Sequence, residues 1–439
     1  MIQYNARAQP SQTPTPKLLD YKKEEHQFQA IDFGIFDPWI KLPINPDEVF
    51  VTYTNDRLLK GSGTPSRERE DRVLASQCFL ALATSYFAHD HHQTQLVEKG
   101  YSRYGAALSK LHAALSDEQR RASYDILEAV MLMCLFETLM SDKKDGWVTH
   151  SLGIQRLFEL RGPESFKTMP ARDMFETARP TIIYACLTMR QLTMLSQPDW
   201  KTVPWSNDPG GKSLYEHLID ILADTPKLIC AKDEALALDD AEARKIAIWQ
   251  VVRQAQHLLT QLRTWKVVWD DAEPDCSVEV ATTQHIPLQA INEENPVLVK
   301  AWETVYSFTS VYHAVTIAHY HATLIHLHRL VRGYDESADA RELEAAEIET
   351  VTSGFEICRT IEYHLRMSSR GEGSFSIMFA LRMAWEAVEE TEPGVAAWLQ
   401  DVLQKIATSP QGRWAVASYL LNRDEIPRGP RTPSRAATN

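Results

Sequence analysis

The sequence DILEAVMLMCLFETLM, residues 125–140, decides the fold of this chain, because apolar side chains occur at almost every position in it. A helix that is apolar nearly all round has no face to turn toward water, so it is buried on every side. The longest unbroken apolar run, Ala129 to Phe136, is far shorter than the roughly 20 residues that a membrane helix needs. The stretch therefore predicts a helix at the centre of a large core.

Amphipathic helices are expected on both sides of this stretch. Before it, Leu108, Leu111 and Leu115 recur at spacings of three and four, which is the period of one helical face. After it, residues 147–163 form a helix that Gly162-Pro163 ends. Residues 172–195 continue the pattern, and residues 197–213 are a proline- and glycine-containing loop, long enough for a binding role.

Three long helices are expected in the second half, over residues 241–269, 295–333 and 338–366. The second starts at Asn295-Pro296 and places Val305 and Phe308 on one face, after a linker at residues 270–294. No run alternates apolar and polar residues for long enough to indicate a sheet. The fold class is all-α. The apolar stripe of the first of these helices comprises Ile248, Val252, Ala255, Leu259, Leu262, Trp265 and Trp269.

The chain divides into three parts by composition. Residues 1–64 form an irregular N-terminal arm, whose aromatic stretch at residues 32–44 is expected to dock on the main body. Residues 65–421 form one large multi-helix domain, and residues 422–439 form a disordered tail rich in proline and arginine.

Charge and cysteine content exclude several classes of protein. The net charge of −13 opposes binding to nucleic-acid phosphates, so we expect no direct DNA binding by this chain. The six cysteines lie far apart, the nearest two, Cys186 and Cys230, being 44 positions apart, so no local zinc or redox motif exists. Scattered thiols favour a reducing compartment, and the N-terminus lacks the apolar segment of a secretory signal. No cofactor motif is present.

Three local patterns suggest chemistry but have simpler interpretations. Gly210-Gly-Lys-Ser213 resembles a phosphate-binding loop, yet Ser206 occupies the position of its first glycine. Asp239-Asp240 and Asp270-Asp271 could hold magnesium, although helix capping or solvation explains them better. The sequence HDHH at residues 89–92 could bind a metal, but we favour a role at the helix end, because successive helical side chains point in different directions.

The strongest candidate site is a set of histidines on the long helix at residues 295–333. His319 and His326 share one face, and His321 and His328 share another. Such histidines could line a ligand pocket or act as acid and base, although satisfied core histidines are the interpretation we favour. We assign no catalytic, cofactor-binding or metal-binding residue.

Several stretches resemble the regulatory domain of fungal zinc-cluster transcription factors. The resemblance covers most of residues 65–420 and is carried by the stretch ALATSYFAHDHH at residues 81–92, by the helix at residues 125–140 and by a pattern around the next helix. We expect Trp147 to anchor that helix and Gly153 to permit close helix contact. The pattern comprises Trp147, His150, Gly153, Leu157 and Arg161-Gly162-Pro163.

In that family a six-cysteine zinc cluster reads DNA, and the helical domain senses metabolites or contacts other proteins. The resemblance therefore implies a nuclear transcription regulator that binds an apolar ligand and another regulator or a second copy of itself. The cysteines of this sequence do not form the cluster, so we expect no DNA-binding module of its own. The pathway controlled would be secondary metabolism. The alternative is a cofactor-independent isomerase or cyclase of secondary metabolism on the same fold, with His321 and His328 as its first suspects and with the cytoplasm as the other location.

Overall fold

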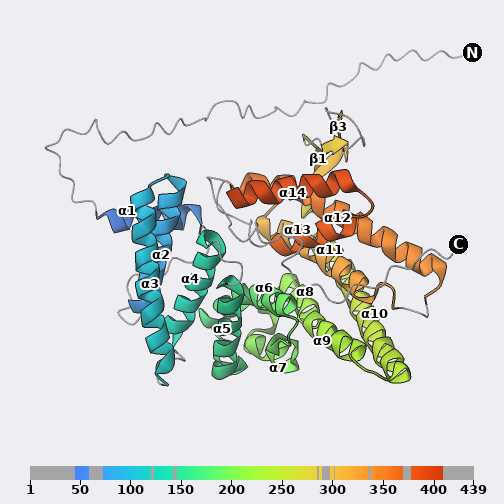
Figure 1. Cartoon of the computed structure of the whole chain (residues 1–439), viewed down its shortest axis with the longest axis horizontal. Helices are drawn as coiled ribbons and strands as arrows, with labels where there is room; N and C mark the ends of the chain where they lie inside the picture. Colours follow the sequence, from blue (N-terminus) through green and yellow to red (C-terminus); the bar gives the residue numbers. More distant parts are fainter. Residues whose placement is uncertain are drawn as a thin grey trace, which may run out of the picture. The chain divides into compact units, whose positions relative to one another are not determined.

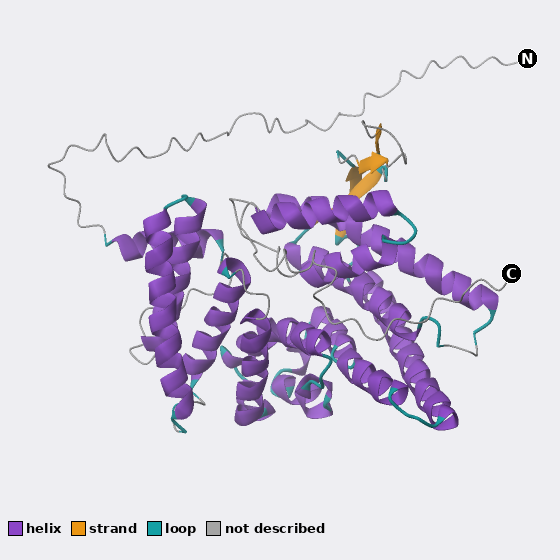
Figure 2. Ribbon diagram, in the orientation of Figure 1, coloured by secondary structure: helices purple, strands orange, loops and turns teal. Residues whose placement is uncertain are grey.

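A computed structural model describes residues 45–58, 73–118, 120, 123–141, 146–283, 286–288, 297–300, 302–334, 338–368 and 377–408. The helices and strands lie in one compact unit, Pro46–Asn439 (Figure 1). Helices dominate, and the strands gather in one place (Figure 2), which confirms the all-α prediction. The aromatic stretch at residues 32–44 and the tail from residue 422 lie outside the described residues.

The larger helices and the strands follow one another along the chain. The helices are α1 (Pro46–Arg57), α2 (Val73–Asp90), α3 (Thr94–Ser116), α4 (Tyr124–Met140), α5 (Gly146–Arg161), α6 (Ala171–Met189), α7 (Pro198–Thr202), α8 (Leu214–Leu222), α9 (Thr225–Leu236), α10 (Ala241–Ala272), α11 (Val311–Val331), α12 (Ala340–Ser368), α13 (Met378–Val388) and α14 (Pro393–Thr408). The strands are β1 (Ser277–Ala281), β2 (Ile286–Leu288), β3 (Val297–Val299) and β4 (Thr304–Phe308).

Helix α4 lies at the centre of the first half of the unit, as its composition predicts. It packs against α2, α3, α5 and α6, and Leu127, Met133 and Leu139 are almost completely buried. Ser123 caps its start by accepting a hydrogen bond from the backbone N–H of Ile126 at 3.3 Å. The buried Asp125 carboxylate accepts from the amides of Leu74 and Ala75 in the first turn of α2, and this contact fixes the two helices in register.

Helix α5 ends where the sequence predicts, at a residue with left-handed backbone. Gly162 has φ +74°, and its N–H closes the last turn on the carbonyl of Phe158 at 2.9 Å. Trp147 is buried at the start of the helix, as expected. The expectation for Gly153 is wrong, because a side chain built there would meet no atom within 4 Å.

The segment predicted as a loop, residues 197–213, is instead made of short helical turns that cover α6. Trp200 and Trp205 are buried against Phe175, with ring centroids 5.8 and 5.7 Å apart. The fully buried Arg179 contacts the carboxylates of Glu216 and Asp220. This network joins α6 to α8.

Lys212 of the GGKS sequence belongs to the same network. Its ammonium contacts Asp220, donates to the carbonyl of Lys201 at 2.6 Å and lies 4.3 Å from the ring of Trp205. Ser213 caps α8 by accepting from the N–H of Glu216 at 3.2 Å. The polar groups of this sequence that make contacts here stabilise the fold. This is consistent with the interpretation that we favoured from the sequence, a loop rather than a phosphate-binding site.

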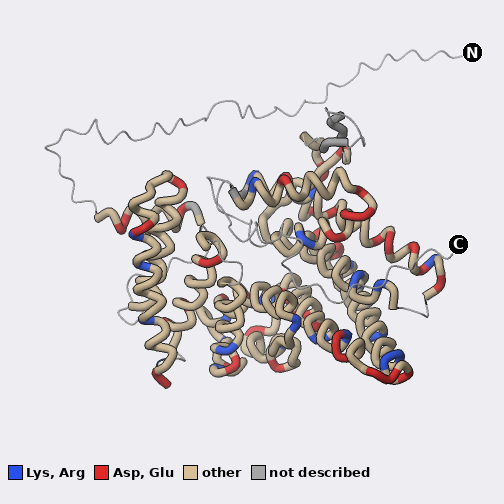
Figure 3. The backbone as a smooth tube through the Cα atoms, in the orientation of Figure 1, with Lys and Arg blue, Asp and Glu red and all other residues tan. Residues whose placement is uncertain are grey.

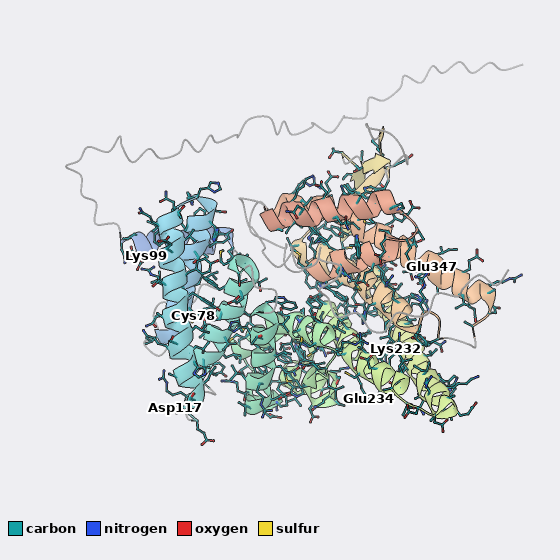
Figure 4. All side chains as sticks on the ribbon, in the orientation of Figure 1. Cys78, Lys99, Asp117, Lys232, Glu234 and Glu347 are labelled. Carbon is teal, nitrogen blue, oxygen red and sulfur yellow. The ribbon has the colours of Figure 1, made fainter. Side chains whose placement is uncertain are left out.

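Helix α10 confirms its predicted stripe, whose residues are buried against α8, α9 and α11. Asp240 caps the helix, accepting from Glu242 and Ala243, which is the capping role favoured for this aspartate. Lys232, labelled in Figure 4, ties α9 to the end of α11 by donating to the carbonyl of Leu330 at 2.6 Å.

The prediction of a helix starting at Asn295-Pro296 is wrong. Residues 304–308 form β4, antiparallel to β1, with Ser277 opposite Phe308, and β2 pairs with β3. The sequence TVYSF is β-branched and aromatic, which suits a half-buried strand. Helix α11 starts only after Ser310, which caps it by accepting from the N–H of His313. Val305 and Phe308 are buried as strand residues.

Two further differences concern helix α1 and the start of α4. Helix α1 lies within the segment predicted to be irregular, residues 1–64, and packs against α2 through Phe50 and Phe87, whose ring centroids are 5.0 Å apart. The sequence Ser116-Asp-Glu-Gln119 also predicts a capping box at the start of the next helix, and this prediction is wrong, because Ser116 is the last residue of α3. Ser123 takes its place.

We predict that replacing Arg179 with methionine lowers the free energy of unfolding by about 3–5 kcal/mol, because the Glu216 carboxylate stays buried without its cation. Urea denaturation followed by circular dichroism measures the change. The matched control is Arg156→Met, since Arg156 is exposed and forms a surface ion pair with Glu159, and we expect a change within about 1 kcal/mol. Equal losses in the two variants would contradict this role of the network.

Candidate functional site

The four candidate histidines occupy two faces of α11, as the sequence predicts. His319 and His326 both approach the ring of Phe379 on α13, with ring centroids 6.4 and 6.2 Å away. His321 and His328 instead contact α12. The two pairs therefore face different neighbours.

His319 is a buried, hydrogen-bonded core residue. Its Nδ1 lies 2.9 Å from the carbonyl of Val315, and its Nε2 contacts the hydroxyl of Tyr184. A carbonyl can only accept, so Nδ1 carries the proton and Nε2 accepts from Tyr184. Burial lowers the pKa of His319 to about 4, so the imidazole is neutral near pH 7.

His326 differs from His319 because its Nε2 is buried without a hydrogen-bond partner among the described residues. Burial lowers its pKa to about 4, with an opposing contribution from Glu386. An unmet buried nitrogen is a place where a small ligand or a water molecule could bind.

His321 and His328 bond to different residues of α12. His321 Nδ1 lies 3.1 Å from the hydroxyl of Ser353, and burial lowers its pKa to about 4. His328 Nε2 lies 2.9 Å from Glu349, which also accepts from Arg263 of α10 at 2.6 Å. These two hydrogen bonds, His328 first, lower the pKa of Glu349 to about 2.

A hollow of about 350 Å³ lies between α10, α11 and the first half of α12. His328 lines it, whereas His319, His321 and His326 do not. Its lining combines apolar and charged side chains. The apolar lining residues include Leu259, Val331, Leu343 and Ala346, and the charged ones are Arg263, Arg329, Arg332, Glu342, Glu347 and Glu349.

The charged side chains of the hollow are held by ion pairs. Arg332 lies 3.6 Å from Glu347, a residue labelled in Figure 4, and Arg329 lies 3.2 Å from Glu386. Sequence reasoning found His328 but missed Arg263 and Glu349. No local signal marks them, because each lies beside a buried stripe on its own helix and only packing brings them together.

This geometry bears on the enzyme alternative. Acid–base catalysis needs two groups that face one substrate, but His321 and His328 bond to separate residues, and only His328 lines the hollow. No observation on this pair favours catalysis over a structural role.

The cysteines and the other histidines show structural contacts. The six cysteines are unpaired, and burial raises the pKa of Cys134 to about 11, which keeps the thiol neutral. In the HDHH sequence, His91 stacks on Phe87 with ring centroids 4.0 Å apart, and its Nδ1 lies 2.9 Å from the carbonyl of Phe87 at the end of α2. Among the described residues, no three His, Cys, Asp or Glu side chains gather as a metal site.

Comparison with known proteins gives one family match. Residues 66–411 match the model of the fungal specific transcription factor domain. An uncharacterized protein of Emericella nidulans is 28% identical over 123 residues, which are 28% of this chain and 26% of that protein. The chain thus aligns with about a quarter of this curated relative. No solved structure matches, and no helix of the described residues is long and apolar enough to cross a membrane.

We predict that the buried histidines make the protein sensitive to mild acid. His319, His321 and His326 have folded-state pKa values of about 4, below the 6.5 of an exposed histidine. As the pH falls below 6.5, the unfolded chain takes up protons that the folded chain does not, so stability is lost between pH 6.5 and 4. Each group contributes a slope of about 1.4 kcal/mol per pH unit.

Denaturation at several pH values tests this expectation on His319. In the variant His319→Gln, the slope of the free energy of unfolding against pH should be smaller by the contribution of about one proton between pH 6.5 and 4.5. This should hold whatever the stability of the variant at pH 7. His112→Gln, a substitution at an exposed position of α3, is the control and should keep the slope of the parent chain. An unchanged slope in His319→Gln would show that this imidazole is protonated in the folded state.

Proposed function

Because the chain belongs to the fungal-specific transcription factor domain family, we propose that it regulates transcription in a fungus through ligand and protein contacts of its helical domain. The observation that carries this proposal is the family match over residues 66–411, which spans α2 to α14. In this proposal the domain acts in the nucleus and binds another regulator or a second copy of itself.

The distribution of charge supports contacts with proteins rather than with nucleic acid. The net charge is −13, and on the described helices Lys and Arg are interspersed with Asp and Glu (Figure 3). Phosphate binding depends on clustered cations that release counterions. The proposed regulator therefore influences genes through its partners.

The hollow beside α11 supports a ligand with an apolar body. Leu259, Val331 and Leu343 offer apolar surface, and Arg263 and Arg332 stand among the lining residues. A small molecule that fills a cavity of this kind would change the packing of α12 on α10 and α11. In this proposal the ligand and the controlled genes belong to secondary metabolism.

We predict that tethering the chain to a promoter changes transcription. Residues 46–439 fused to a heterologous DNA-binding domain should alter a reporter gene several-fold in fungal cells, compared with the DNA-binding domain alone. The matched control is the same fusion carrying Arg179→Met, whose lower stability should weaken the effect. A folded fusion that leaves the reporter unchanged would contradict the proposal.

We also predict that the 439-residue chain alone gives no sequence-specific shift of DNA at physiological salt, since its net charge opposes phosphate binding. An electrophoretic mobility assay with a library of promoter fragments measures this. Transcript profiles of a deletion strain test the pathway. Unchanged secondary-metabolite genes would overturn that part of the proposal alone.

A further inference from the structure

Helix α1 lies outside the region that matches the family, yet it covers part of that region. The family match begins at residue 66, whereas α1 spans Pro46–Arg57. The helix packs against α2 (Figure 1), and residues 59–72, which connect α1 to α2, lie outside the described residues. The contacts of α1 therefore show what kind of segment this side of α2 accepts.

Aromatic side chains carry the contact between α1 and the end of α2. Phe50 is buried and packs on Phe87, with ring centroids 5.0 Å apart. Tyr53 meets Phe87 edge-on at 5.2 Å and lies 5.0 Å from the ring of His91. The hydroxyl of Tyr53 also donates to the carboxylate of Asp90 at 2.5 Å. Two aromatic residues three positions apart thus hold α1 on α2.

An ion pair holds the start of α1. Nη2 of Arg103 on α3 donates to both carboxylate oxygens of Asp47, at 2.9 and 3.1 Å. Nη1 of Arg103 donates to the hydroxyl of Thr84 on α2 at 2.7 Å, which fixes the orientation of the guanidinium. Arg103 therefore selects a segment with an acidic residue at this position.

The docking of α1 also buries polar atoms without partners. The hydroxyl of Thr54 is completely buried and has no hydrogen-bond partner among the described residues. The side-chain oxygen of Asn55 is buried in the same way. A buried polar group of this kind loses its hydrogen bonds to water and gains none in return. These losses weaken the docking of α1.

The sequence of α1 favours helix only weakly by itself. PDEVFVTYTNDR contains four β-branched residues, which lose side-chain freedom in a helix. A helix of 12 residues is also marginal in water without tertiary contacts. We therefore expect α1 to be helical only while it is docked, so undocking gains back conformational entropy.

We propose that α1 is a displaceable occupant of a helix-binding surface on α2 and α3. This surface, which we call the α2–α3 docking surface, consists of Thr84, Phe87, Asp90, His91 and Arg103. The partner that fits it is an amphipathic helix of another protein that repeats the pattern of α1, an acidic residue followed three and six positions later by aromatic residues. This inference goes beyond the proposed function, because it concerns a segment outside the family match.

Simple arithmetic gives the strength of such a contact. A segment of the same chain competes for the surface at an effective concentration on the order of 1 mM. An undocked population of about 5% lies within the range of ordinary minor states. The same helix supplied as a free peptide then binds an empty surface with a Kd on the order of 50 µM, and binds the parent chain about twentyfold more weakly, because α1 competes with it.

Hydrogen exchange of the full chain, followed by mass spectrometry, tests whether α1 undocks by itself. We expect the amides of α1 to exchange at least tenfold faster than those of α4, because α1 opens locally. Thr54→Val removes the unpaired hydroxyl at nearly constant volume and should slow exchange in α1 at least threefold. Thr52→Val makes the same change at an exposed position and should leave exchange within about twofold of the parent chain. Exchange in α4 should stay the same in both variants.

A labelled peptide of residues 45–58 tests the α2–α3 docking surface in trans. The receptor is the full chain with Phe50→Ala, whose own α1 is loosened, and fluorescence polarisation should give a Kd on the order of 50 µM. In the peptide, Asp47→Asn should weaken binding at least fivefold, because it removes the charge that Arg103 meets. Asp56→Asn removes the same charge from the exposed side and should leave the Kd unchanged.

A second change in the receptor shows whether Asp47 acts through Arg103. Adding Arg103→Met to the Phe50→Ala chain should weaken binding of the parent peptide at least fivefold, and Asp47→Asn in the peptide should then have no further effect. Three results would overturn the proposal: exchange in α1 as slow as in α4, no slowing by Thr54→Val, or a peptide that fails to bind the Phe50→Ala chain. None of these measurements involves transcription, so each leaves the proposed function to its own test.

Discussion

The structure depends on burying α4, a helix with no polar face. Because nearly every side chain of α4 avoids water, neighbours must cover it on all sides, and α2, α3, α5 and α6 do so. At roughly 25 cal/mol per Å² of apolar surface, covering such a helix is among the largest favourable contributions to folding. The carboxylate of Asp125 orients this packing, since it accepts hydrogen bonds from two amides in the first turn of α2 at the start of α4.

Polar groups inside this core are tolerated because each is paired or neutral. Arg179 has no exposed surface and retains its charge because two carboxylates of α8 surround it. His319 follows the other route, since burial keeps its ring neutral and a carbonyl and a tyrosine hydroxyl satisfy both nitrogens. Ion pairs and hydrogen bonds therefore offset the cost of burying these polar side chains. Such structural roles account for most of the residues that look catalytic in the sequence.

Function in this fold is expected at surfaces left over by the packing. The hollow beside α11 is such a surface, and α10 forms part of its lining. One side of this helix completes the core, and its flank carries Arg263 to the hollow.

The sequence by itself determined the helical class, the central place of residues 125–140, the stop at Gly162, the stripe of α10 and the two histidine faces of α11. Each depends on local periodicity or backbone chemistry, which a single segment contains. Only the tertiary structure decided that residues 304–308 form a strand, that residues 197–213 cover α6, and that Glu349 joins His328 to Arg263. These outcomes depend on which distant segments meet, and the free energy of such contacts is not written in the spacing of neighbouring residues.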